Sequence, residues 1–159
     1  MVIRKAERAD RDALGRLGAL LMDVHYNFDR RRFLDPGADA SAGYARFLLS
    51  QLNDPDAIIL VAEHEGAVVG YCYAGIEPLS WKELRDEAGF IHDLALDPAA
   101  RRQGAGRALV DAAIDWFRGR GLVRVMLWTS TQNHAARELF AGAGFRPTMT
   151  EMTLDLPSS

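Results

Sequence analysis

The chain has 159 residues, of which 48% are hydrophobic, 26% charged and 9% aromatic. This length and composition are typical of one soluble globular domain and exclude a fibrous or disordered chain. Lysine and arginine number 19 against 22 acidic residues, which gives a net charge of −3. Such a balance argues against nucleic acid as a partner.

The use of cysteine and histidine excludes further kinds of site. The single cysteine, Cys72, cannot form an internal disulfide, and the 4 histidines lack the spacing of metal ligands, so we expect no bound metal. Cys72 lies among β-forming residues and is predicted to be a core residue. No apolar run approaches the roughly 20 residues that span a bilayer, and the N-terminus does not resemble a secretory signal. We therefore expect no membrane partner and a cytoplasmic location.

Hydrophobic periodicity and turn residues divide the chain into short strands and helices. In chain order, the predicted elements are a strand at 1–5, helices at 10–27 and 41–52, strands at 57–63, 67–76 and 90–96, a helix at 104–118, a strand at 122–128, a helix at 133–141, and one or two strands within 145–156. The order β-α-α-β-β-β-α-β-α-β-β predicts an α/β fold. We expect a single domain over residues 1–159, with helices flanking a mixed, mostly antiparallel sheet.

The most informative segment is the loop that follows the strand at 90–96. It contains Arg101, Arg102, Gly104 and Gly106, and a helix begins at the glycines. Free N–H groups and the dipole at a helix start favour an anion, and glycine lets phosphate oxygens approach the backbone. The pattern lacks the third glycine of a dinucleotide fingerprint and the lysine of a P-loop. A solvated loop with a glycine-assisted helix start is the structural alternative.

Two motifs resemble the GNAT superfamily of N-acetyltransferases. Arg101-x-x-Gly104-x-Gly106 after a strand ending Leu94-x-Leu96 resembles the loop that binds the pyrophosphate of acyl-CoA. Asn133-x-x-Ala136-x-x-x-Phe140-x-x-x-Gly144-Phe145 resembles the helix that lies beside the CoA arm. The motifs occur in the family's order about 30 residues apart, and with the predicted elements the resemblance covers essentially the whole chain.

The resemblance implies acetyl-CoA as acyl donor and assigns residues to its binding. Backbone groups of Leu94, Ala95 and Leu96 would pair with the pantetheine arm like an added strand. Asn133 would cap its helix, and it would either have this role alone or also form a hydrogen bond to the CoA arm. The residues that would surround the pyrophosphate, mostly through N–H groups, are Arg102, Gln103, Gly104, Ala105, Gly106 and Arg107, with Arg101 acting by charge or by holding the loop.

Amide formation also requires a base, because the amine must lose a proton before it attacks the thioester. A Glu-Asp pair precedes the pantetheine strand in the spermidine/spermine acetyltransferase branch of the family, and here the pair is His92-Asp93. Strict strand alternation puts His92 on the face of Leu94 and Leu96, with Asp93 on the other face. An unperturbed imidazole titrates near 6.5, so His92 is the predicted base, directly or through water. Asp93 is the other catalytic candidate, and a merely packed histidine is the structural alternative.

The chain departs from the family at Phe140. Many members have a tyrosine at this point, whose hydroxyl protonates the departing thiolate. Phe140 would still pack against the thioester region. Tyr71, Tyr73 or water are candidate proton donors, as are Ser130 and Thr131, and a thiolate is also a tolerable leaving group without one.

Two loops have both a functional and a structural interpretation. Arg30, Arg31 and Arg32 lie where the family admits the acceptor, and they form either a solvated patch or a substrate clamp. Trp81 and its acidic neighbours form either a lip for a cationic amine or a charged surface.

These observations predict an acetyl-CoA-dependent N-acetyltransferase that acts on a primary amine of a small molecule or peptide. Direct attack in a ternary complex is expected, since no activated serine or cysteine is visible. The alternatives are acetylation of a protein N-terminus or lysine, and a non-catalytic sensor domain that binds acyl-CoA. A homodimer is the expected assembly, as for many small enzymes.

Overall fold

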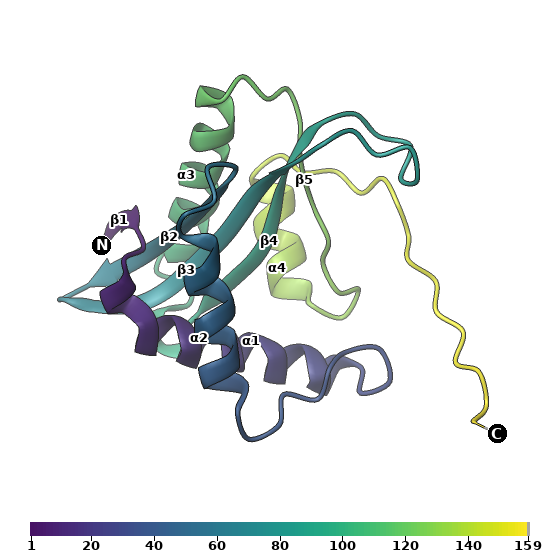
Figure 1. Ribbon diagram of the computed structural model, residues 1–159, viewed down its shortest axis with the longest axis horizontal. Coiled ribbons are helices and arrows are strands. Elements are labelled where there is room, and N and C mark those ends of the chain that lie inside the picture. The colour runs from purple at the N-terminus through teal and green to yellow at the C-terminus, as the bar shows by residue number, and fades with distance from the viewer. Residues whose placement is uncertain (159) are drawn as a thin grey trace.

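A five-stranded sheet forms the centre of the molecule (Figure 1). The computed structural model describes residues 1–158, and its strands follow one another in sequence order across the sheet. The first four strands are antiparallel neighbours, whereas the fourth and fifth are parallel. The strands are β1 (Val2–Lys5), β2 (Ala57–His64), β3 (Ala67–Glu77), β4 (Ala88–Leu96) and β5 (Val125–Leu127). The helices are α1 (Arg11–Phe28), α2 (Ala40–Gln51), α3 (Ala105–Gly119) and α4 (His134–Gly142), with short 3₁₀ turns η1 (Arg8–Asp10) and η2 (Pro98–Ala100).

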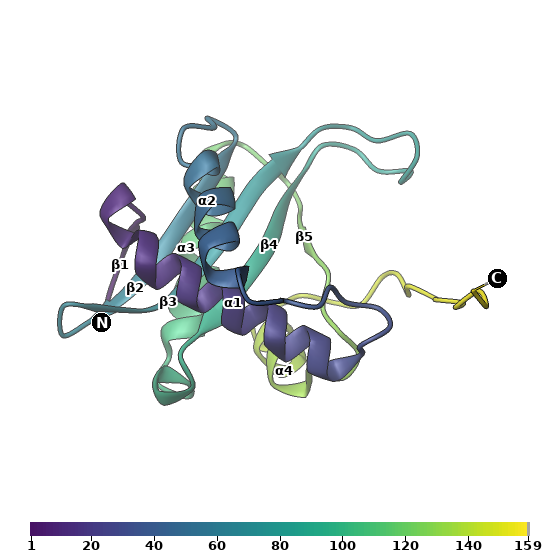
Figure 2. The same cartoon turned by 60° about the horizontal axis from the view of Figure 1, so that its bottom comes forward.

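Helices cover both faces of the sheet, as the alternating strand residues require. On one face, Leu14 and Leu17 of α1 and Leu48 of α2 pack against β2 and β3. On the other face, Leu109 and Phe117 of α3 form a second core with the intervening strand residues. Figures 1 and 2 show α1 and α2 on one side of the sheet and α3 on the other. Cys72 is fully buried in the α3 core, as predicted.

The predicted fold class and the order of elements from β1 to α4 are confirmed. The prediction of one or two strands within residues 145–156 is wrong, because residues 143–158 contain no helix or strand. An alternating sequence forms a strand only where its backbone meets another strand. Here the segment is held instead by side chains, through ion pairs from Arg32 to Glu151 and from Arg31 to Asp155. None of the helices in residues 1–158 combines the length and apolar character needed to cross a bilayer.

The sheet opens between β4 and β5. Their parallel pairing joins Gly89, Phe90 and Ile91 to the three residues of β5 and goes no further. From residue 93 to residue 96, β4 keeps its pairing with β3 while its other edge faces a gap. This gap positions the candidate site.

Candidate active site

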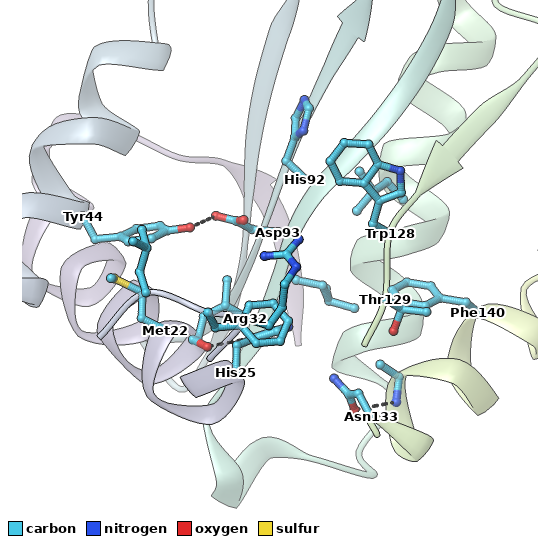
Figure 3. A pocket seen from close by; sticks show the side chains of 16 residues that line it. Met22, His25, Arg32, Tyr44, His92, Asp93, Trp128, Thr129, Asn133 and Phe140 are labelled. Atoms are coloured by element: carbon cyan, nitrogen blue, oxygen red, sulfur yellow. Dashed lines mark hydrogen bonds between the residues drawn. The ribbon is translucent and has the colours of Figure 1, made fainter. Parts of the chain in front are cut away.

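A cavity of about 520 Å³ lies where β4 and β5 separate (Figure 3). Its walls come from both faces of the sheet: α1 with the loop after it, α2, the middle of β4, the end of β5 and α4. The lining side chains with polar or aromatic groups are His25, Arg32, Phe33, Tyr44, His92, Asp93, Trp128, Thr129, Asn133 and Phe140.

His92 and Asp93 both point to the face covered by α2, which corrects the expected alternation. Asp93 pairs with Tyr73, but the next pair along the ladder is Ile91 with Ala74, so His92 is an extra residue in β4. Such a β-bulge breaks the regular alternation of side chains. The ring of His92 lies 4.9 Å from that of Tyr73, whereas Leu94 packs against the α3 core. The prediction that His92 shares a face with Leu94 and Leu96 is therefore wrong.

Asp93 is a buried carboxyl group held by two tyrosines. The Tyr44 hydroxyl donates to its Oδ2 at 2.6 Å, and the Tyr71 hydroxyl donates to the same oxygen at 2.9 Å. Burial raises the pKa of Asp93, and the two hydrogen bonds oppose this shift only in part. Burial and the charge of Asp93 also raise the pKa of both tyrosines, which keeps their hydroxyls protonated as donors. Neither of these hydrogen bonds uses Oδ1, so this oxygen keeps its capacity to accept from a ligand.

His92 is paired with a carboxylate at the end of β3. Its Nε2 lies 3.2 Å from Glu77 Oε1, and its side chain is 30% exposed. The ring stacks on Phe90, with centroids 6.0 Å apart. When Nε2–H donates to Glu77, the neutral ring has its lone pair at Nδ1. The geometry thus leaves Nδ1 as the atom that can accept a proton.

The N-terminus of α3 lies at the predicted glycine loop and is open, as an anion site would require. Gly104 is its N-cap with a φ of 84°, in the left-handed region that favours glycine. No side chain caps the helix, and its ladder begins with Ala108 N–H donating to Gly104 O. The N–H groups of Ala105, Gly106 and Arg107 therefore have no intrahelical partner and lie at the positive end of the helix dipole.

Three arginines are expected near this loop, but only two of them have a guanidinium group that is not paired with another group of the described residues. The Arg107 guanidinium binds Asp111 and the Gly142 carbonyl, each at 2.9 Å. Its side chain thus joins α3 to the end of α4, and only its backbone N–H is left open at the start of α3. Arg101 and Arg102 are exposed beside the turn.

Gly106 and Gln103 shape the turn itself. A Cβ on Gly106 would lie 3.0 Å from Leu96 and 3.3 Å from Leu139, so glycine allows α3 to approach β4 and α4 closely. The Gln103 side-chain amide donates to the Ala99 carbonyl at 2.9 Å. These contacts hold the open amides of α3 against the end of β4.

The three residues expected beside a pantetheine arm divide between the cavity and the cores. Leu94 lines the cavity, whereas Ala95 is 4% exposed and packs on the α1 side. Leu96 packs against the α3 core. All three residues lie on the part of β4 whose edge does not pair with β5.

Asn133 and Phe140 bring α4 into the cavity wall. The Asn133 side chain accepts from the Ala136 N–H at 3.2 Å, so the predicted cap is present. Phe140 is 8% exposed and meets Phe145 edge-on. Its ring faces the gap and has no hydroxyl group that could donate a proton.

The tyrosines considered as replacements for a hydroxyl at Phe140 lie outside the cavity lining. Tyr71 is fully buried and donates to Asp93, and the Tyr73 hydroxyl donates to Gln51 at 3.1 Å. Thr129, just after β5, does line the cavity. Across residues 1–158, no three His, Cys, Asp or Glu side chains are grouped so that they suit a metal ion.

Sequence reasoning missed the role of Tyr44. Helical spacing explains Tyr44 as a core residue, and nothing local indicates that its hydroxyl reaches β4. Arg32 lines the cavity and pairs with Glu151, and its side chain is 40% exposed, so both interpretations of the arginine run stay open. Trp81 is 86% exposed and lies outside the cavity lining.

Comparison with known proteins agrees with this geometry. Residues 22–145 match the acetyltransferase (GNAT) family. The chain belongs to this family. The matched GNAT segment includes the β4 bulge, the α3 loop and α4, and it stops where the exposed C-terminal segment begins.

The GNAT relatives include enzymes with a named substrate, among them an aminoglycoside acetyltransferase and mycothiol acetyltransferases. Aminoglycoside N(6')-acetyltransferase type 1 from Klebsiella aerogenes is 33% identical over 101 residues, which make up 64% of this chain and 66% of that protein. The chain thus spans just under two thirds of that relative's length. An uncharacterized N-acetyltransferase of Bacillus subtilis, YhfO, is 31% identical over 147 residues, covering 91% of this chain and 89% of the relative. The crystal structure of a predicted acetyltransferase with acetyl-CoA from Clostridium acetobutylicum has the same fold, with a TM-score of 0.70, 16% identity, and coverage of 97% and 95% of the two chains.

Proposed function

We propose that this protein transfers an acetyl group from acetyl-CoA to a primary amine of a small molecule or peptide. The observation that carries the proposal is the sequence of features along β4. The open amides of α3 follow one end of the strand, its unpaired edge comes next, and the His92–Asp93 bulge stands where that edge begins. The pyrophosphate, the amide-containing arm and the thioester of acetyl-CoA require three such features in the same order.

The donor would be bound mainly by backbone groups. The pyrophosphate would accept hydrogen bonds from the first N–H groups of α3, with Arg101 and Arg102 adding charge. The pantetheine amides would pair with the free edge of β4 as an added strand. The thioester would then lie in the gap near Phe140. The solved acetyltransferase that contains acetyl-CoA shares this fold, which supports the assignment.

The amine would be activated at the bulge. Asp93 Oδ1 would bind the incoming ammonium group, and His92 Nδ1 would remove its proton, directly or through one water. The free amine would attack the thioester carbonyl carbon, and the C–S bond would break as the amide forms. The CoA thiolate would take its proton from the imidazolium or from solvent. The buried thiol of Cys72 is out of reach, which favours direct attack over an acyl-enzyme.

The walls of the cavity favour a polar, cationic acceptor. Asp93 and Glu77 supply negative charge close to the bulge, while Arg32 lies across the cavity and is neutralised by Glu151. A relative that is named for acetylating aminoglycosides supports a small polyamine as the acceptor class. Protein N-termini and lysine side chains are the other acceptor class to test.

The proposal is tested by titrating acetyl-CoA calorimetrically and measuring CoA release over a panel of aminoglycosides, polyamines, amino acids and peptides. We expect binding of acetyl-CoA and turnover with at least one amine. His92→Gln should lower kcat roughly 10²-fold or more without changing acetyl-CoA affinity, and His64→Gln, at the exposed end of β2, is the matched control. Near-wild-type kcat in His92→Gln would indicate that Asp93 or a bound water acts as the base. Binding without turnover on any amine would instead indicate a sensor domain.

A further inference from the structure

His25 lines the cavity from the last turn of α1, and no step of the proposed reaction uses it. Two aromatic side chains pack against its ring. The Phe28 ring meets it edge-on with centroids 5.8 Å apart, and the Phe33 ring meets it at 5.0 Å and an angle of 66°. These contacts hold the imidazole in one orientation relative to α1 and the loop that follows.

One hydrogen bond determines which nitrogen of this ring carries the proton. His25 Nδ1 lies 2.8 Å from the Leu21 carbonyl oxygen, one turn earlier in α1. A carbonyl oxygen only accepts, so Nδ1 is the N–H donor, and the neutral ring has its lone pair at Nε2. Within residues 1–158, Nε2 has no hydrogen-bond partner. The cavity wall thus contains a nitrogen that is free to accept a hydrogen bond.

The surroundings of His25 in the cavity are mainly apolar. Met22 and Phe33 line the cavity on the same side, and Figure 3 shows His25 and Met22 together at the α1 wall. Arg32 also lines this side, but its guanidinium group is a donor only, pairs with Glu151 and lies over the Phe33 ring at 4.9 Å. A few polar groups in an apolar wall fix the orientation of a small ligand. His25 Nε2 is such a group, and its chemistry suits an O–H or N–H donor.

Asp93 lies between His25 and the predicted base. In Figure 3, His92 and His25 appear at opposite ends of the cavity, with Asp93 between them. Burial raises the pKa of Asp93, and the charges of His92 and His25 are among the smaller effects that oppose this shift. Both imidazoles are therefore near this carboxyl group. An acceptor molecule whose ammonium group is bound at Asp93 can reach His25 with a second polar group.

We propose that His25 is a specificity-determining residue, which accepts a hydrogen bond at Nε2 from a second polar group of the acceptor. The inference rests on the proposed function, because it concerns the same cavity and the same amine. It narrows the acceptor class to amines that also carry a hydroxyl group or a second N–H group, such as amino alcohols, amino sugars and diamines. This hydrogen bond binds and orients the acceptor, whereas His92 and Asp93 handle the proton of the reacting amine.

Pairs of substrates that differ by one hydroxyl group test the proposal. A series of linear amino alcohols is compared with alkylamines of equal length, and CoA release gives kcat/KM for each. At the best chain length, the wild-type protein should prefer the amino alcohol by about fivefold to tenfold, the effect of one net hydrogen bond. His25→Phe should abolish this preference and leave kcat/KM for the alkylamine unchanged, because a phenyl ring packs like imidazole but has no lone pair to offer.

Two further variants separate loss of the nitrogen from loss of the ring. His25→Gln keeps an acceptor in its side-chain carbonyl and should retain part of the preference. His64→Phe, the same change at the exposed end of β2, is the matched control and should behave like wild type. Circular dichroism and thermal melting establish that each variant is folded. Equal preference in wild type and folded His25→Phe would overturn the proposal, as would a wild type without preference at any chain length.

Nitrogen NMR of the His25 ring tests the same inference without catalysis. We expect a protonated Nδ1 and an unprotonated Nε2 in the neutral ring of the free protein. The Nε2 signal should shift when an amino alcohol is added and shift less with the matched alkylamine. A neutral ring protonated at Nε2, or equal shifts with both amines, would overturn the proposal. Absence of CoA release with every amine would instead overturn the proposed function, and the NMR comparison would still decide the role of His25.

Discussion

Asp93 differs from an ordinary carboxyl group because burial raises its pKa above the usual value of 3.8. The folded protein therefore holds this proton more tightly than the unfolded chain does. The stabilising contribution of Asp93 is fully present below the unfolded pKa and is lost as the pH rises through the raised folded pKa. The two tyrosine hydroxyls limit this loss, because they donate to the ionised form.

Asp93→Asn should remove this part of the pH dependence of stability. We expect the free energy of unfolding of the variant to fall less than that of wild type as the pH rises from the acid range toward neutral. Urea unfolding at a series of pH values measures the difference, and Asp23→Asn on the exposed side of α1 is the control. Parallel curves for wild type and Asp93→Asn would show that Asp93 titrates as it does in the unfolded chain.

Phe140→Tyr should leave the activity unchanged or increase it. The ring lies in the cavity wall beside the gap. An added hydroxyl could protonate the departing thiolate, which would raise kcat by about 10²-fold. Steady-state kinetics with acetyl-CoA titration separates this effect from binding, and Phe145→Tyr, on the ring that packs against Phe140, is the control. Loss of kcat with intact acetyl-CoA affinity would mean that the acceptor uses this position.

At this scale the sequence predicted the identities of the site residues better than their directions. The pair His92-Asp93 was predicted as the catalytic candidates, but strict alternation separated two side chains that the bulge places on one face. A bulge depends on how two strands fit together, and the sequence of one strand does not reveal it. Tyr44 was missed for a similar reason, because its partner Asp93 is 49 residues away along the chain.

Among the elements, α3 depends most directly on local sequence. Its glycine N-cap, its open amides and its amphipathic face all arise from consecutive residues, and the prediction of a helix beginning at the glycines was close to its observed bounds. By contrast, β5 is only three residues long and residues 145–156 form no strand. Strand formation depends on a distant partner, which a single sequence does not specify.

Gly104→Val should weaken acetyl-CoA binding by about tenfold or more. A Cβ at this position would meet no atom of the protein within 4 Å, so it would lie in the open space that the phosphates need, and the φ of +84° also strains any other residue. Calorimetric titration of acetyl-CoA measures the loss. Gly119→Val, at the other end of the same helix and also in open space, should bind acetyl-CoA like wild type. Unchanged affinity in folded Gly104→Val would contradict the assignment of the α3 loop.

For the whole molecule, hydrophobic periodicity was sufficient to predict the architecture. Alternating strand residues and helical stripes require two helical layers on a sheet, and the two cores observed here fulfil that requirement. The resemblance to the GNAT family indicated only which residues would bind acetyl-CoA, and the position of the cavity was not predicted. Its opening results from the divergence of β4 and β5, for which no residue pattern in either strand gives a signal.

That divergence makes β4 an interior strand over one half of its length and an edge strand over the other. An exposed strand edge can pair with any extended chain, and proteins commonly cover such edges to prevent aggregation. In this molecule the edge from residue 92 to residue 96 must stay open, because the donor's amides would occupy it. In the proposed binding mode acetyl-CoA covers this edge as a neighbouring strand would, so we expect the ligand-free protein to aggregate more readily than the complex.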